Sequence, residues 1–81
     1  MQREYTVAIT SKSGYQVDLY KYTAPSLDRA AEVAALRADN ISEGCGLRLS
    51  WTVYDGRGRV MASWIEAGHH IPAGNPVRAM A

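Results

Sequence analysis

The stretch that most constrains the fold is residues 47–66, where two alternating runs flank an Asp-Gly pair. The first run reads Leu-Arg-Leu-Ser-Trp-Thr-Val-Tyr and the second reads Arg-Val-Met-Ala-Ser-Trp-Ile-Glu. Asp-Gly between two such runs is typical of a β-hairpin. The predicted apolar face holds Leu47, Leu49, Trp51, Val53, Val60, Ala62 and Trp64. We expect Trp51 to pair with Val60 or with Ala62, and both registers keep these residues on one face.

A second hairpin is predicted near the N-terminus. Residues 4–10 alternate, Ser11 to Gly14 supply turn residues, and residues 15–22 resume the alternation. If Ile9 lies opposite Tyr15, the apolar face holds Tyr5, Val7, Ile9, Tyr15, Val17 and Leu19. The outward face then carries Gln16, Asp18, Tyr20 and Tyr22.

A helix is predicted between the two hairpins. Pro25 cannot donate to a strand ladder, and Ser26 can cap the first helical turn. The helix is expected to run to about Asn40, with an apolar stripe of Leu27, Ala30, Ala31, Ala34, Ala38 and Ile41. We therefore predict an α+β fold of ββαββ order: a four-stranded antiparallel sheet with one helix packed on one face. The other face would meet solvent, the tail or a partner.

Length and composition favour one small folded domain. The 81 residues are 47% hydrophobic and carry a net charge of +1, so no bulk basic field draws the chain to nucleic acid. We assign residues 1–66 to the ββαββ domain and residues 67–81 to a Gly/Pro-rich C-terminal tail that wraps the sheet edge or is partly disordered. A single cysteine and no signal-peptide or membrane-spanning run favour a cytoplasmic protein, as a monomer or a weak homodimer.

No residue pattern predicts catalysis, a metal site or a cofactor. The adjacent His69 and His70 would point apart in an extended segment, and we interpret them as solvent-exposed tail residues. Cys45 is interpreted as a buried or inert thiol. The run Gly56-Arg57-Gly58 lacks the Lys and Ser/Thr of a phosphate-binding loop and is interpreted as a hairpin turn. The protein is therefore predicted not to be an enzyme.

The outward sheet face is the predicted partner-binding surface. Its candidate residues are Tyr20, Tyr22, Arg48, Tyr54, Arg57 and Arg59. Tyrosine and arginine are enriched at protein interfaces, and both can also contact nucleic acid. The alternative is that the tyrosines reflect strand propensity and the arginines keep a turn solvated.

Four stretches of this layout carry a family resemblance. They are Ala24-Pro25-Ser26-Leu27 with Ala30 and Ala34, Gly46 to Ser50, Asp55-Gly56, and Val60 to Ser63. In this order they are similar to small phage-encoded anti-CRISPR proteins that inhibit type I Cascade complexes. The chain differs from that group in its longer Gly/Pro tail and in having arginines in place of lysine-rich patches.

The resemblance implies a non-enzymatic inhibitor in the host cytoplasm. Such a protein binds a backbone or large subunit of Cascade and blocks target DNA, while the missing lysine-rich patch argues against direct contact with DNA. The alternative is a small nucleic-acid-binding accessory domain of phage or bacterial origin. That domain would bind DNA or RNA directly and more weakly as salt rises.

Overall fold

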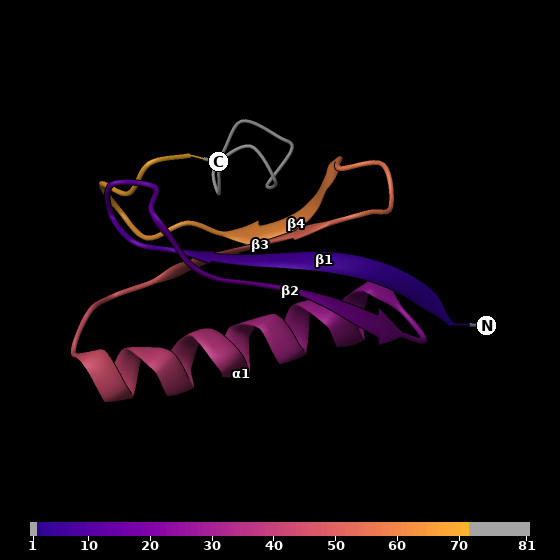
Figure 1. Cartoon of the computed structure of the whole chain (residues 1–81), viewed down its shortest axis with the longest axis horizontal. Helices are drawn as coiled ribbons and strands as arrows, with labels where there is room; N and C mark the ends of the chain where they lie inside the picture. Colours follow the sequence, from indigo (N-terminus) through magenta and orange to yellow (C-terminus); the bar gives the residue numbers. More distant parts are fainter. Residues whose placement is uncertain (1, 72–81) are drawn as a thin grey trace.

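The computed structural model describes residues 2–71, which form one antiparallel sheet and one helix. In chain order the elements are β1 (Arg3–Thr10), β2 (Gln16–Ala24), α1 (Leu27–Cys45), β3 (Ser50–Tyr54) and β4 (Val60–Trp64). The strand order is β2-β1-β3-β4, and α1 lies against one side of the sheet (Figure 1). The predicted ββαββ fold is confirmed. Residues 72–81 of the predicted tail lie outside the described residues.

Local caps define the two ends of α1. The Ser26 hydroxyl accepts a hydrogen bond from the backbone N–H of Arg29 at 3.2 Å, as its N-cap position requires. At the other end Gly46 adopts a left-handed φ of 72° and donates its N–H to the Ser42 carbonyl at 2.8 Å. The helix therefore ends at Cys45, beyond the predicted Asn40, because the apolar stripe continues to Ile41 and the left-handed glycine follows Cys45.

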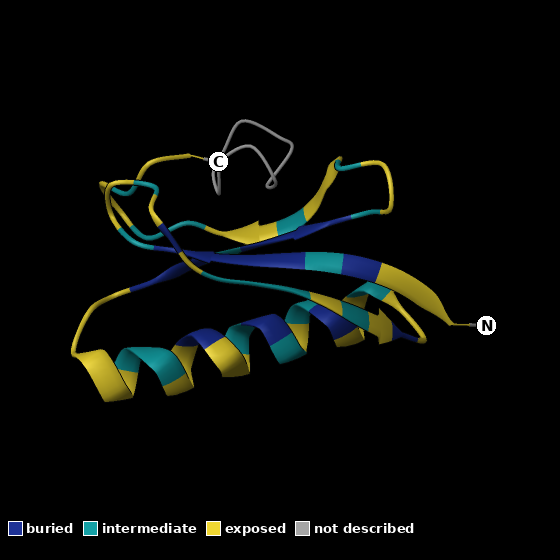
Figure 2. Cartoon of the chain, viewed as in Figure 1, coloured by how far each residue is buried: buried dark blue, intermediate teal, exposed yellow. Residues whose placement is uncertain are grey.

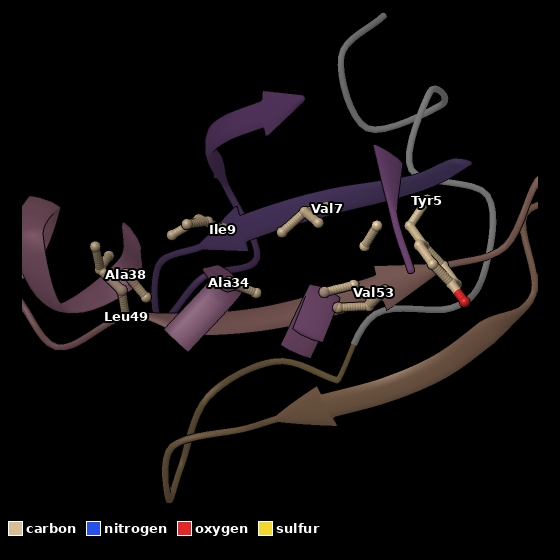
Figure 3. Close-up of a cluster of buried hydrophobic side chains, with 9 residues drawn as sticks. Tyr5, Val7, Ile9, Ala34, Ala38, Leu49 and Val53 are labelled. Atoms are coloured by element: carbon tan, nitrogen blue, oxygen red, sulfur yellow. The ribbon is translucent and has the colours of Figure 1, made fainter. Parts of the chain in front are cut away.

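The core lies between α1 and the facing side of the sheet. Alanines on three successive helical turns are buried, so the helix backbone comes close to the strands. Figure 3 shows the side chains that meet there, and the buried cluster is Tyr5, Val7, Ile9, Ala24, Ala30, Ala34, Ala38, Leu49 and Val53. Removing this apolar surface from water supplies the main favourable term in folding.

The register of the first hairpin differs from the prediction. Ile9 pairs with Asp18, not with Tyr15, and Thr10 pairs with Gln16 across a register shift. Directly paired residues share a face, so Tyr20 and Tyr22, opposite Val7 and Tyr5, lie on the helix side of the sheet. The predicted outward position of the two tyrosines was wrong, because one extra residue in β2 exchanges the faces of the strand.

The second hairpin forms where predicted but with a longer loop. Trp51 pairs with Trp64 and Val53 with Ala62, so both predicted registers were wrong. The loop is organised by the Asp55 carboxylate, whose Oδ1 accepts the backbone N–H groups of Arg57 at 2.8 Å and Arg59 at 3.0 Å. Trp51, Val53, Ala62 and Trp64 share the helix side, as expected. A register shift between Val53 and Tyr54 instead pairs Val60 with Tyr54, away from the helix.

The central strands β1 and β3 are mostly buried (Figure 2), and this includes residues on the sheet face away from the helix. The buried residues on this face are Ala8, Thr10, Gln16, Ser50, Thr52 and Tyr54. Residues 66–70 pass over one end of it, where the Glu66 N–H donates to Ser50 Oγ at 2.9 Å and the His70 N–H donates to the Lys12 carbonyl at 3.0 Å. The prediction of an exposed aromatic face is therefore wrong at the centre of the sheet.

Candidate partner-binding surface

The three tyrosines predicted to bind a partner do not share a surface. Tyr20 packs on the helix side, where the Arg37 guanidinium carbon lies 4.5 Å from its ring centroid. Tyr22 is also partly buried against the core. Tyr54 pairs with Thr6 on the opposite face and is only 1% exposed. The sheet thus separates Tyr54 from the other two.

Burial also changes the chemistry of these phenols. It raises the pKa of Tyr54, and it raises the pKa of Tyr20 despite the opposing effect of the nearby Arg37 charge. The Tyr20 hydroxyl has no hydrogen-bond partner within residues 2–71. Tyr20 and Tyr54 are neutral, inward-packed side chains whose contacts support the sheet.

The three predicted arginines are exposed but lie at opposite ends of the β3–β4 hairpin. Arg57 and Arg59 belong to its turn, whereas Arg48 precedes β3 at the far end. Arg59 Nε donates to Asp55 Oδ2 at 2.9 Å, and the hydrogen bond from the Arg59 backbone is the main reason that the pKa of Asp55 is lowered. The Arg57 guanidinium has no acidic partner among residues 2–71 and is free to meet one.

Arg48 is linked to β4 through a carboxylate. Its guanidinium lies 3.3 Å from Glu66 Oε2, and Trp64 Nε1 donates to Glu66 Oε1 at 3.2 Å. The Trp64 hydrogen bond is the leading cause of the lowered pKa of Glu66, and Arg48 adds to it. Arg48 and Trp64 are therefore held on the same part of the hairpin.

Between the two arginine groups runs β4, which is mostly exposed (Figure 2). Val60 is 46% exposed, Met61 44% and Trp64 58%. We define the β4 edge surface as Val60, Met61 and Trp64 together with Arg48, Arg57 and Arg59. Val60 and Trp64 lie on opposite faces of the sheet, so a partner contacts both only along the edge of β4. The three apolar residues were not predicted as site residues, because Val60 and Trp64 were assigned to a buried face. Only the strand order, which places β4 at the sheet edge, identifies them.

Three loops enclose an open groove at one end of the sheet. It has a volume of about 780 Å³ and is lined by Ser11, Lys12, Ser13, Leu47, Arg48, Ala67, Gly68 and His69. Lys12 and Arg48 bring positive charge to the groove, although Arg48 also contacts the carboxylate of Glu66. The groove can therefore accept an anionic group, with Leu47 offering an apolar wall.

A serine and a histidine lie in contact beside this groove. Ser50 Oγ is 2.9 Å from His69 Nδ1 and also accepts the N–H of Glu66. A serine nucleophile needs access to a substrate, whereas Ser50 is fully buried. The pair instead fixes the segment after β4 to the sheet. His69 is thus half-buried, which corrects its interpretation as a solvent-exposed tail residue.

The other candidate reactive residues are not brought together. His70 is exposed, and its ring lies so close to Gly14 that a Cβ there would be 2.9 Å from ring carbon Cδ2. Cys45 is an exposed free thiol in the last turn of α1, not the buried one that we considered. Within the described chain, no three His, Cys, Asp or Glu residues are positioned to hold a metal ion.

Comparisons with known proteins give no relative. No family model, curated protein or solved structure matches the chain. Across residues 2–71, the structure contains no helix with both the length and the apolar character needed to cross a membrane.

Proposed function

We propose that this chain is a non-enzymatic inhibitor that docks on a type I CRISPR effector complex and blocks the binding of target DNA. Docking occurs through the β4 edge surface. The observation that carries the proposal is an exposed apolar strand with arginines at both ends. The family resemblance supplies the identity of the partner.

The composition of the β4 edge surface supports a role in protein binding. Protein interfaces combine an apolar centre with a polar rim, and they are enriched in Trp, Met and Arg. Here Met61 and Trp64 form the centre and the arginines form the rim. Trp64 is the expected anchor, because large side chains that become desolvated contribute most of the binding energy in such surfaces.

The charges of the surface indicate what the partner must offer. The Arg57 guanidinium forms no ion pair among residues 2–71, and the Arg48 side chain is 84% exposed although it pairs with Glu66. Acidic side chains on a backbone or large subunit of Cascade would complement them. In this proposal the bound chain obstructs the target DNA by occupying the surface of the subunit. No enzymatic step is needed for this form of inhibition.

The test is a competition between the purified protein and target DNA. Type I complexes are mixed with the protein, and binding of a target duplex is measured by gel shift. We expect the wild type to reduce duplex binding and Trp64→Ala to weaken that inhibition roughly 30-fold or more, as for loss of an interface anchor worth about 2 kcal/mol.

A matched control tests whether the loss of any exposed apolar side chain weakens inhibition, or only the loss of one in the β4 edge surface. Leu36 on α1 is 56% exposed, close to the 58% of Trp64, but lies outside the β4 edge surface. Leu36→Ala should inhibit as the wild type does. Unimpaired duplex binding by all type I subtypes in the presence of the wild-type protein would reject the proposal.

The groove favours a second candidate, a small nucleic-acid-binding domain. Lys12 and Arg48 line the groove and could contact phosphate groups. This candidate predicts direct binding of DNA or RNA that weakens steeply with salt and is reduced by Lys12→Ala. The inhibitor proposal predicts no such binding by the isolated chain.

A further inference from the structure

We infer that two copies of the chain associate through antiparallel pairing of their β4 strands, which joins their sheets into one. Pairing uses the same strand as the β4 edge surface, so a paired chain cannot also dock there on the effector complex, and the inference rests on the structure of β4 rather than on the proposed function. It starts from the position of β4, which has β3 on one side and no other strand beside it in residues 2–71. Four of its five residues are exposed, so this edge is open along its length.

The open edge lacks most of the features that keep strands from pairing. Edge strands are commonly protected by inward charges, Lys, Pro or a covering element. β4 reads Val-Met-Ala-Ser-Trp and has no charged residue and no proline. Its bulge lies at the Val60 end, which leaves Ala62, Ser63 and Trp64 in regular pairing with β3. These three residues can pair with a second strand.

Two-fold symmetry fixes which residues meet. Isologous pairing about Ser63 places Ala62 of one copy opposite Trp64 of the other, since each is one residue from Ser63. Both side chains lie on the helix side of their sheets. The small Ala62 leaves space for the Trp64 indole, so pairing covers exposed aromatic surface at two symmetric places.

The charged residues on either side of β4 take no part in this pairing. Arg59 Nε donates to Asp55 of its own copy, and Glu66 is held by Arg48 and Trp64. The bulge near Val60 and the end of β4 at Trp64 confine the regular pairing to the three uncharged residues from Ala62 to Trp64.

The size of the contact sets its strength. Stable interfaces bury about 1,600 Å² in total, and one five-residue edge strand supplies much less. The dimer should therefore form at high protein concentration and dissociate on dilution. Sedimentation of the full chain should show the average mass moving from 8.9 kDa toward twice that value as concentration rises.

The position of Ser63 on the symmetry axis allows a sharp test. Ser63 is exposed, so Ser63→Glu and Ser63→Lys leave the core intact. In a homodimer each variant places like charges opposite one another, and each alone should remain at 8.9 kDa at concentrations where the wild type dimerises. An equal mixture of the two variants should recover the dimer, because opposite charges then face each other.

The control charges a site away from the edge. Leu36→Glu adds a carboxylate on the exposed side of α1 and should dimerise as the wild type does. A wild type that stays monomeric at every concentration would overturn the inference, and so would Ser63 variants that dimerise alone as well as the wild type. Neither result bears on the proposed function, because no effector complex is present in this experiment.

Discussion

The two edges of the sheet differ in how they are protected. Strand β2 carries Asp18 and Lys21, and Arg37 from α1 reaches across to pair with Asp18 and stack on Tyr20. Strand β4 carries no charge and is exposed on most of its residues. The helix contacts β2 and β4 alike, so the difference between the two edges lies in their side chains. The first edge is protected by charged residues and by Arg37, whereas the last edge carries no such group and is available to another molecule.

The largest expected effect concerns residues 66–69, which follow β4 and are fixed to the sheet by Ser50. Ser50→Ala removes the hydroxyl that holds Glu66 and His69, and leaves the partly buried amide of Glu66 without its acceptor. We expect a loss of about 1–3 kcal/mol in the free energy of unfolding, measured by urea denaturation. Hydrogen exchange at the Glu66 amide should also become faster.

Ser63→Ala is the matched control for this change. Ser63 lies on β4 but is exposed, so its substitution should alter stability by no more than about 0.5 kcal/mol. If Ser50→Ala were equally neutral, the segment after β4 would not be fixed by Ser50.

A smaller effect is expected at the β2 edge. Arg37→Ala removes an ion pair and a cation–π contact that lie over this edge. The Arg37 side chain is half exposed, so solvent screens the pair, and we expect a loss of about 0.5–1 kcal/mol in the free energy of unfolding. The measurement is again urea denaturation.

Lys21→Ala provides the comparison on the same strand. Its ammonium group lies 4.0 Å from Glu4, and both side chains are largely exposed. Substitution should leave stability almost unchanged. Equal losses for Lys21 and Arg37 would contradict a protective role for the arginine.

The smallest effect concerns the turn that leads into β4. The pKa of Asp55 lies below its ordinary 3.8, first because the Arg59 backbone donates a hydrogen bond to the carboxylate. The ionised carboxylate therefore adds stability that is fully present above pH 3.8 and is lost as pH falls through the lower, folded-state pKa. Urea denaturation at neutral and at acidic pH should show this loss in the wild type. Asp55→Asn should show a smaller loss, because Glu66, whose pKa is also lowered, still contributes in the variant. Identical pH profiles would exclude the linkage.

The local elements could be predicted from sequence because their signals are local. The Asp-Gly pair marks the second hairpin, and Ser26 caps α1 as expected. The alanine stripe correctly indicated which face of the helix packs on the sheet. Each of these features depends on a few neighbouring residues, so tertiary contacts did not change them.

The candidate site could not be predicted in the same way. Tyr20 and Tyr22 were placed outward by continuing an alternation through the turn, and a register shift in the first hairpin reversed their face. Trp64 was assigned to the buried side, and it does face the helix side, but β4 lies at the edge and leaves it exposed. The arginines were correctly expected to be exposed, since a turn and a strand end give them no cover.

The sequence by itself determined where the strands, turns and helix lie, because capping, turn chemistry and alternation act over a few residues. Tertiary structure alone decided which face Tyr20, Tyr22 and Tyr54 occupy and which strands lie at the edges of the sheet. These outcomes depend on register shifts and strand order, which are set by contacts between segments far apart in the chain. A shift of one residue changes no local preference, yet it moves every following side chain to the other face of the sheet.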